Sequence, residues 1–200
     1  MTQRVLVTGI SGYVGQHVAA QLLNHGYEVV GTVRSLSKSA APKAALASVA
    51  STDKLSFVEA DLMSDAGWNE AMVGCNYVMH IASPFFVAEP KDESVLIAPA
   101  VEGTRRVLSA AKNANVQRVV LTSSIVAMTA GLPSGRYGTE AWSNVDANIG
   151  AYAKSKTLAE QVAWEFVKDG SMELVTINPG FILGPPLGVA GDGQSVAMIS

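Results

Sequence analysis

The stretch VLVTGISGYVG at residues 5–15 decides the fold, because an apolar run ends there in three glycines spaced three apart. A continuous apolar run rich in β-branched residues is typical of a strand that is buried on both faces. Gly9, Gly12 and Gly15 come where such a strand stops and a helical pattern begins. We therefore expect a buried strand, a tight turn and a helix.

The three glycines suit a turn that must be sharp, must let a ligand approach the main chain and must pack helix against sheet. The helix that follows offers free N–H groups and the positive end of its dipole, both of which favour phosphate. The spacing G-x-x-G-x-x-G is one residue longer in its first gap than the common dinucleotide pattern. The loop predicts a pyrophosphate site, and a plain tight turn is the alternative.

Apolar runs alternate with helix-length segments along the rest of the chain. We expect strands at 4–9, 27–33, 54–61, 77–83, 117–124 and 172–180. Helices are expected near 13–25, 38–50, 65–73, 93–113 and 150–169, and a long loop over the strand ends at 125–149. This order predicts an α/β fold, a Rossmann-type doubly wound parallel sheet with helices on both faces, which binds ligands at the carboxyl ends of its strands.

Composition excludes several classes of function. The 200 residues carry a net charge of −3, with no basic stripe for nucleic acid. No apolar run approaches the roughly 20 residues that cross a bilayer, so we expect a cytoplasmic protein without a membrane partner. Cys75 is the single cysteine and the three histidines lie far apart, so no metal site is expected.

The end of the second expected strand bears on cofactor choice. An acidic residue there would bind the ribose 2′-hydroxyl of NAD, but this chain has Arg34 in the stretch GTVRS. A guanidinium pairs with a 2′-phosphate, so NADP(H) is preferred and NAD(H) remains possible; a merely solvated arginine is the alternative. Thr8, Asp61 and Ala82 close three other strands where the adenosine half would lie, although Asp61 could instead cap a helix.

Tyr152 and Lys156 lie four residues apart in a helical stretch and therefore share one face. The pKa of tyrosine is near 10, and we expect the neighbouring ammonium to lower it and make Tyr152 a usable acid or base. Ser124, at the end of the fifth strand, is expected to hydrogen-bond the substrate oxygen that Tyr152 protonates. A Y-x-x-x-K pair alone is often structural, and its meaning here comes from the glycine loop and the Thr-Ser-Ser that precede it.

These motifs resemble the short-chain dehydrogenase/reductase superfamily, specifically its extended branch, through TGISGYVG, DL, LTSS, YAKSK and NPGFILGP. HIASP at 80–84, TVRS, and YAKSKTLAEQVAWEF at 152–166 resemble the group of dihydroflavonol 4-reductase and cinnamoyl-CoA reductase. The resemblance implies a catalytic triad of Ser124, Tyr152 and Lys156, with Ser123 as the alternative serine. It also implies hydride transfer from NADPH to an aldehyde or ketone, with Tyr152 as the general acid.

The resemblance further implies that Lys156 binds the nicotinamide ribose and that Pro179, Gly180 and Phe181 line the nicotinamide. The cofactor-binding residues expected in all are Thr8, Gly9, Ser11, Gly12, Tyr13, Val14, Gly15, Arg34, Lys38, Asp61, Leu62, Ile81, Ala82, Ser83, Thr122, Tyr152, Lys156, Pro179, Gly180, Phe181 and Ile182. Relatives often dimerise through the helices expected at 93–113 and 150–169, so a homodimer is one possible state.

Two departures from the family pattern qualify these expectations. AVEGT at 100–104 stands where many sugar-nucleotide relatives have N-V-N-G-T, which weakens an epimerase interpretation. Members of this branch also continue into a C-terminal substrate lobe. We therefore expect residues 1–184 to form the dinucleotide-binding domain and 185–200 to begin a truncated substrate-binding region. A nucleotide-sugar epimerase or dehydratase with bound NAD, and a dinucleotide sensor without turnover, remain alternatives.

Overall fold

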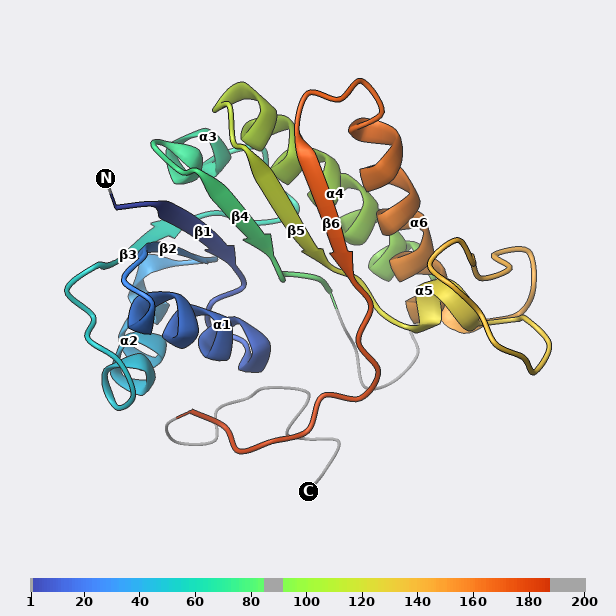
Figure 1. Cartoon of the computed structure of the whole chain (residues 1–200), viewed down its shortest axis with the longest axis horizontal. Helices are drawn as coiled ribbons and strands as arrows, with labels where there is room; N and C mark the ends of the chain where they lie inside the picture. The colour runs from blue at the N-terminus through green and yellow to red at the C-terminus, as the bar shows by residue number, and fades with distance from the viewer. Residues whose placement is uncertain (1, 85–91, 188–200) are drawn as a thin grey trace.

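A single parallel sheet of six strands organises the part of the chain that the computed structural model describes, residues 2–84 and 92–187 (Figure 1). The strands are β1 (Arg4–Thr8), β2 (Glu28–Val33), β3 (Leu55–Glu59), β4 (Tyr77–His80), β5 (Arg118–Thr122) and β6 (Glu173–Ile177). Their order is β3-β2-β1-β4-β5-β6, so the direction of winding reverses between β1 and β4. The predicted Rossmann-type class is confirmed, with each strand slightly shorter than expected.

The helices are α1 (Tyr13–Asn24), the 3-10 turn η1 (Leu36–Lys38), α2 (Ala40–Ala47), α3 (Trp68–Met72), α4 (Ser94–Asn113), α5 (Val126–Thr129) and α6 (Gly150–Phe166). Two expectations were wrong in part. The segment 125–149 is not all loop, because the turn α5 forms where Ala127 can be buried. Helix α6 ends at Phe166 rather than near 169, since the chain turns at Gly170, whose φ is +71°.

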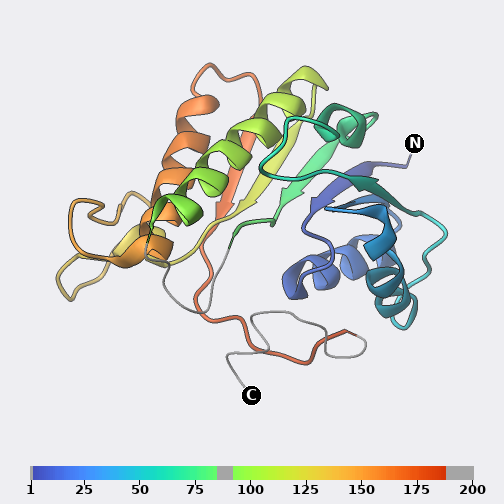
Figure 2. The ribbon, with the colours of Figure 1, turned by 180° about the vertical axis from the view of Figure 1, so that it is seen from behind.

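Helices lie on both faces of the sheet, as predicted. On one face α1 and α2 pack over β1, β2 and β3 around Val5, Val7 and Val29. On the other face α3, α4 and α6 pack around Leu6 and Val119, and Figure 2 shows α4 and α6 lying side by side over the strands. Because both faces of β1 and β2 are covered, these strands read as unbroken apolar runs in the sequence.

The first face is covered over only half of its width by the described residues. No described helix lies on that face over β6, where Val175 is 38% and Ile177 51% exposed. Leu174, also on β6, packs against the core of the opposite face instead. The two halves of the sheet therefore differ in how much apolar surface they bury.

The carboxyl ends of β1, β4 and β5 meet at one edge of the sheet. Thr8 of β1 is in register with His80 of β4, and His80 is in register with Leu121 of β5. The chain leaves β1 toward α1 on one face, whereas it reaches α4 on the other face after β4 (Figure 1). This divergence of the connections is the arrangement that gives doubly wound sheets their ligand site.

Candidate active site

The loop between β1 and α1 needs glycine for steric reasons at two positions. Gly9 has a φ of +68°, and a Cβ there would lie 3.0 Å from the Cα of Ala82. A Cβ on Gly15 would lie only 2.2 Å from the carbonyl oxygen of Gly9. The N–H of Gly12 closes the turn by donating to that same oxygen at 3.0 Å. The predicted reasons for glycine, a sharp turn and close packing of helix on sheet, thus hold at Gly9 and Gly15.

The first turn of α1 presents main-chain donors at this loop. Gly12 is the N-cap and supplies no side-chain hydrogen bond, and the first turn, which begins with Tyr13, Val14 and Gly15, contains no acidic residue. N–H groups at an uncapped helix start bind anions, and a phosphate would meet no negative side chain from this turn. The loop and helix therefore fit a pyrophosphate group.

The residues expected around the adenosine half lie along the same edge. Arg34 directly follows β2, Lys38 closes η1, and both are exposed. Asp61 accepts a hydrogen bond from the N–H of Met63 at 2.9 Å. The alternative of Asp61 as a helix cap is wrong, because the next helix begins only at Trp68.

Leu62 is fixed by the helix that follows β4 rather than by its own strand. Its carbonyl oxygen accepts from Arg106 Nη1 at 2.8 Å. Its side chain packs where a Cβ on Gly103 would lie, 2.8 Å away. The glycine of the AVEGT stretch is therefore required for the contact between α4 and Leu62.

Thr8 joins the ends of β1 and β4. Its Oγ1 accepts the N–H groups of Ile81 and Ala82, each at 2.9 Å, and also lies 2.9 Å from His80 Nδ1. Because two donors occupy the hydroxyl oxygen, its hydrogen is left to donate to Nδ1, which places the ring proton of His80 on Nε2. Burial, and then Lys156, lower the pKa of His80 to about 3, so the ring is neutral.

Tyr152 of α6 and Ser124 after β5 are brought together. The Ser124 side chain hydrogen-bonds the Tyr152 hydroxyl, which lowers the pKa of that phenol, but burial outweighs it and the pKa is raised above its ordinary value. The expectation that the ammonium of Lys156 lowers the Tyr152 pKa was wrong. Lys156 Nζ donates instead to the main-chain oxygen of Thr122 at 3.0 Å.

Lys156 is buried beside the end of β5. Burial lowers its pKa to about 8, and the opposite charge of Glu160, one helical turn further along α6, acts against that lowering. A buried lysine with a pKa near neutrality can exchange its proton at physiological pH.

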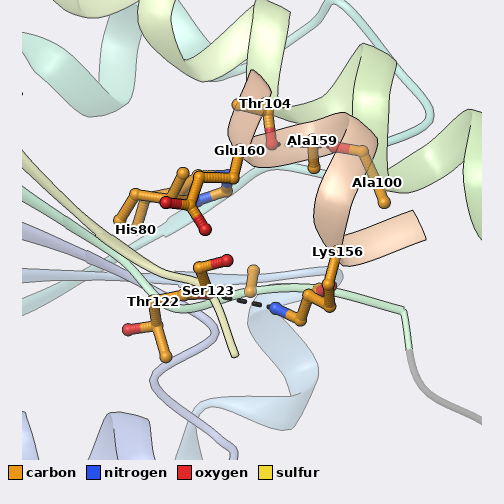
Figure 3. Close-up of a pocket in the computed structure, with 11 residues that line it drawn as sticks. His80, Ala100, Thr104, Thr122, Ser123, Lys156, Ala159 and Glu160 are labelled. Carbon is orange, nitrogen blue, oxygen red and sulfur yellow. Dashed lines mark hydrogen bonds between the residues drawn. The ribbon is translucent and has the colours of Figure 1, made fainter. Parts of the chain in front are cut away.

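A small cavity lies behind this lysine, between β4, β5, α4 and α6 (Figure 3). Its polar lining includes His80, Ser123, Lys156 and Glu160. It is on the scale of a single water molecule. The Oγ of Ser123 is buried here and finds no hydrogen-bond partner among the described residues. Ser124 contacts Tyr152, whereas Ser123 lines the cavity, so the geometry favours Ser124 over the alternative serine.

The segment after β6 completes the edge. The N–H of Ile125 donates to the carbonyl oxygen of Pro179 at 2.9 Å, which ties this segment to the end of β5. Gly180 and Ile182 are exposed, and Phe181 is 86% exposed. The segment then crosses to α1, where His17 Nε2 lies 3.0 Å from the Pro185 carbonyl oxygen.

Three expectations concern absences or unplaced residues. Within 2–84 and 92–187, no group of three His, Cys, Asp or Glu side chains could hold a metal ion. The helices of this part include none that is both long and apolar enough to cross a membrane. The segment expected to begin a substrate-binding region lies, from residue 188 onward, outside the described residues.

Two polar residues at this edge, the buried Glu160 and the half-buried Asn178, were not predicted from the sequence. Glu160 and Asn178 share a hydrogen bond of 2.7 Å beside Ser124 and Lys156. Glu160 follows Lys156 by four residues, so its helical spacing was a usable signal. Asn178 carried no such signal, because its neighbours become apparent only when β6 pairs with β5.

Comparison with known proteins is consistent with this geometry. The model of the NAD dependent epimerase/dehydratase family matches residues 5–200. The chain belongs to that family. Within the family it is similar to cinnamoyl-CoA reductase of Medicago truncatula, at 37% identity over 92% of this chain and 59% of the relative. Dihydroflavonol 4-reductase of Hordeum vulgare is 34% identical over 90% of this chain and 53% of its own length.

A solved structure of yeast methylglyoxal/isovaleraldehyde reductase, complexed with NADPH, superposes on this family member with a TM-score of 0.82. The two are 29% identical over 93% of this chain and 60% of the yeast protein. The resemblance to the dihydroflavonol 4-reductase and cinnamoyl-CoA reductase group is confirmed. The chain spans less than two thirds of the length of each of these relatives.

Proposed function

We propose that this protein is an NADPH-dependent reductase of an aldehyde or ketone. The observation that carries the proposal is the hydroxyl contact of Tyr152 with Ser124 beside the buried Lys156. This group lies at the same edge of the sheet as the glycine loop, as nicotinamide chemistry requires. The reductase names of the relatives support the same class of reaction.

The proposed mechanism assigns the proton to Tyr152. NADPH, when bound, supplies hydride to the carbonyl carbon. The Tyr152 hydroxyl donates its proton to the carbonyl oxygen, and the pKa raised by burial keeps the phenol protonated before that step. Ser124 hydrogen-bonds the phenolate that remains, and the Lys156 ammonium is assigned to the nicotinamide ribose of the bound cofactor. A proton from solvent then restores the phenol.

The preference for NADPH is proposed from the exposed cations at the end of β2. Arg34 and Lys38 can both reach a phosphate at that end of the sheet, and no acidic side chain directly follows the strand. A guanidinium pairs with phosphate through two parallel hydrogen bonds. The NADPH complex of the yeast reductase supports this choice.

We propose further that residues 1–184 form the dinucleotide-binding domain, because all six strands lie within them. A cytoplasmic location, a small carbonyl substrate and a homodimer through α4 and α6 are part of the same proposal. The exposed Trp164 of α6 is a suitable dimer contact.

An assay of NADPH oxidation against a panel of aldehydes and ketones tests the proposed function, with Y152F as the matched control. Oxidation that depends on a carbonyl and is lost in Y152F is the expected result. Purified protein that carries NAD and consumes no free NADPH would instead indicate an epimerase or dehydratase. Binding of NADPH without oxidation by any carbonyl would indicate a sensor.

A further inference from the structure

Glu160 is a buried carboxylate whose environment is built from several elements. Its side chain is on α6 and the residue is only 5% exposed. Burying a carboxylate is costly unless charge and hydrogen bonds compensate. Here Oε2 accepts from the Asn178 amide at 2.7 Å, and Oε1 lies 3.4 Å from the indole nitrogen of Trp164. Glu160 is therefore held in one orientation.

Asn178 extends this contact to the main chain of Ser124. The amide nitrogen that donates to Glu160 also donates to the Ser124 carbonyl oxygen at 3.2 Å. On either side of Ser124, the N–H of Ser123 donates to Ile177 and the N–H of Ile125 donates to Pro179. Asn178 thus fills the gap between two main-chain bonds, and Glu160 fixes its amide from the helix side.

The same carboxylate faces Lys156 with the opposite charge. Both residues line the small cavity, with Lys156 one turn earlier on α6 (Figure 3). The other polar residues that line the cavity are uncharged: His80, Ser83, Thr104, Thr122 and Ser123. Tyr152, beyond Lys156 on α6, is neutral at physiological pH as well. Glu160 is the one negative charge in this described group.

We propose that Glu160 is a positioning residue, which fixes Asn178 against the main chain of Ser124 and provides the charge that keeps Lys156 protonated. The effect of Glu160 on turnover rests on the proposed reductase function. Its two parts, charge and hydrogen bond, can be separated, because glutamine keeps an acceptor for Asn178 but carries no charge. Alanine removes both.

The charge is tested by NMR titration of the Lys156 side chain, followed through its ¹³Cε signal and assigned by the loss of that signal in K156M. In E160Q the pKa of Lys156 should fall by about one pH unit from its value near 8. The matched control is E165Q, which removes an exposed charge from the same helix and should leave the titration unchanged. An unchanged Lys156 titration in E160Q would overturn the charge role.

The hydrogen bond is tested by comparing kcat at pH 6, where Lys156 is protonated in each variant. E160Q should stay within about threefold of the parent protein, whereas E160A should lose roughly 10- to 100-fold through the displaced Asn178. If E160A does not fold, N178A provides the same comparison with Glu160 in place. Equal kcat in E160Q and E160A, or full activity in N178A, would refute the positioning role.

The pH profile links the two parts. Activity that needs the ammonium of Lys156 falls as the pH rises through its pKa, so the falling limb of kcat/KM should move to lower pH in E160Q. The NMR titration uses neither NADPH nor a carbonyl. A Lys156 shift in a protein that reduces no carbonyl would therefore refute the proposed function and leave the charge role intact.

Discussion

The loop after β1 and the carboxyl end of β5 lie at the same edge of the sheet but are built from different parts of the chain. The loop presents main-chain N–H groups, and its glycines are fixed by contacts as short as 2.2 Å that any Cβ would make. The end of β5 presents side chains, whose behaviour depends on burial and charge. Substitutions in the loop should therefore alter folding, whereas those near β5 should alter chemistry in a folded protein.

The largest expected effect is that of Y152F on the side-chain region. Removing the hydroxyl should lower kcat by about 10²–10⁴-fold, because the proton donor is lost, with little change in thermal stability or NADPH affinity. Steady-state kinetics measure kcat, and cofactor fluorescence measures NADPH affinity. Turnover within threefold of the parent protein would exclude Tyr152 from the reaction. A loss of NADPH affinity without a loss of kcat would make Tyr152 a cofactor-binding residue rather than the proton donor.

The next effect concerns the nucleotide end of the same edge. R34D should weaken NADPH binding by roughly 10- to 100-fold, since a charge-assisted phosphate contact is replaced by repulsion. Binding of NADH should be nearly unchanged. Titration with NADPH and with NADH gives the ratio of the two affinities directly. An NADPH affinity in R34D equal to that of the parent protein would mean that Arg34 is only solvated.

A smaller effect is expected for G15A in the main-chain region. The added Cβ meets the Gly9 carbonyl oxygen, so the free energy of unfolding should fall by about 1–3 kcal/mol. Gly135 provides the control, because a Cβ there makes only ordinary contacts, of 3.4 Å or more, and G135A should change stability by less than about 0.5 kcal/mol. Denaturant unfolding compares G15A with G135A, and equal free energies of unfolding for the two variants would contradict the steric role of Gly15.

The smallest effect is expected where the sheet is uncovered. V175T lies on the exposed face of β6 and should alter stability by no more than about 0.5 kcal/mol. V119T, on the buried face of β5, should cost about 1–3 kcal/mol because it buries a hydroxyl. Thermal unfolding of the two variants tests whether the two faces differ, and a similar loss of stability for both would mean that Val175 is covered.

Much of the fold could be predicted from the sequence because its signals are local. Apolar runs mark the strands, and the spacing of Gly9, Gly12 and Gly15 marks the loop that follows β1. The helical spacing of Tyr152 and Lys156 likewise placed both residues on α6.

The electrostatics of the site could not be predicted in the same way. The Tyr152 pKa depends on burial, which was not evident from its neighbours in sequence, and Lys156 turns to a main-chain oxygen of Thr122. The choice between Ser123 and Ser124 depended on which side of β5 each faces. The contact of Glu160 with Asn178 joins residues that only the pairing of β5 with β6 brings together.

Deuterium transfer from NADPH that carries deuterium at both C4 positions tests the proposed redox role of this edge of the sheet. The reaction is run with the reactive members of the carbonyl panel, and mass spectrometry locates the label in the alcohol. We expect one deuterium on the former carbonyl carbon for each NADPH consumed, and its loss in Y152F. Tight NADPH binding without any labelled alcohol would contradict hydride transfer from NADPH to a carbonyl carbon beside Tyr152.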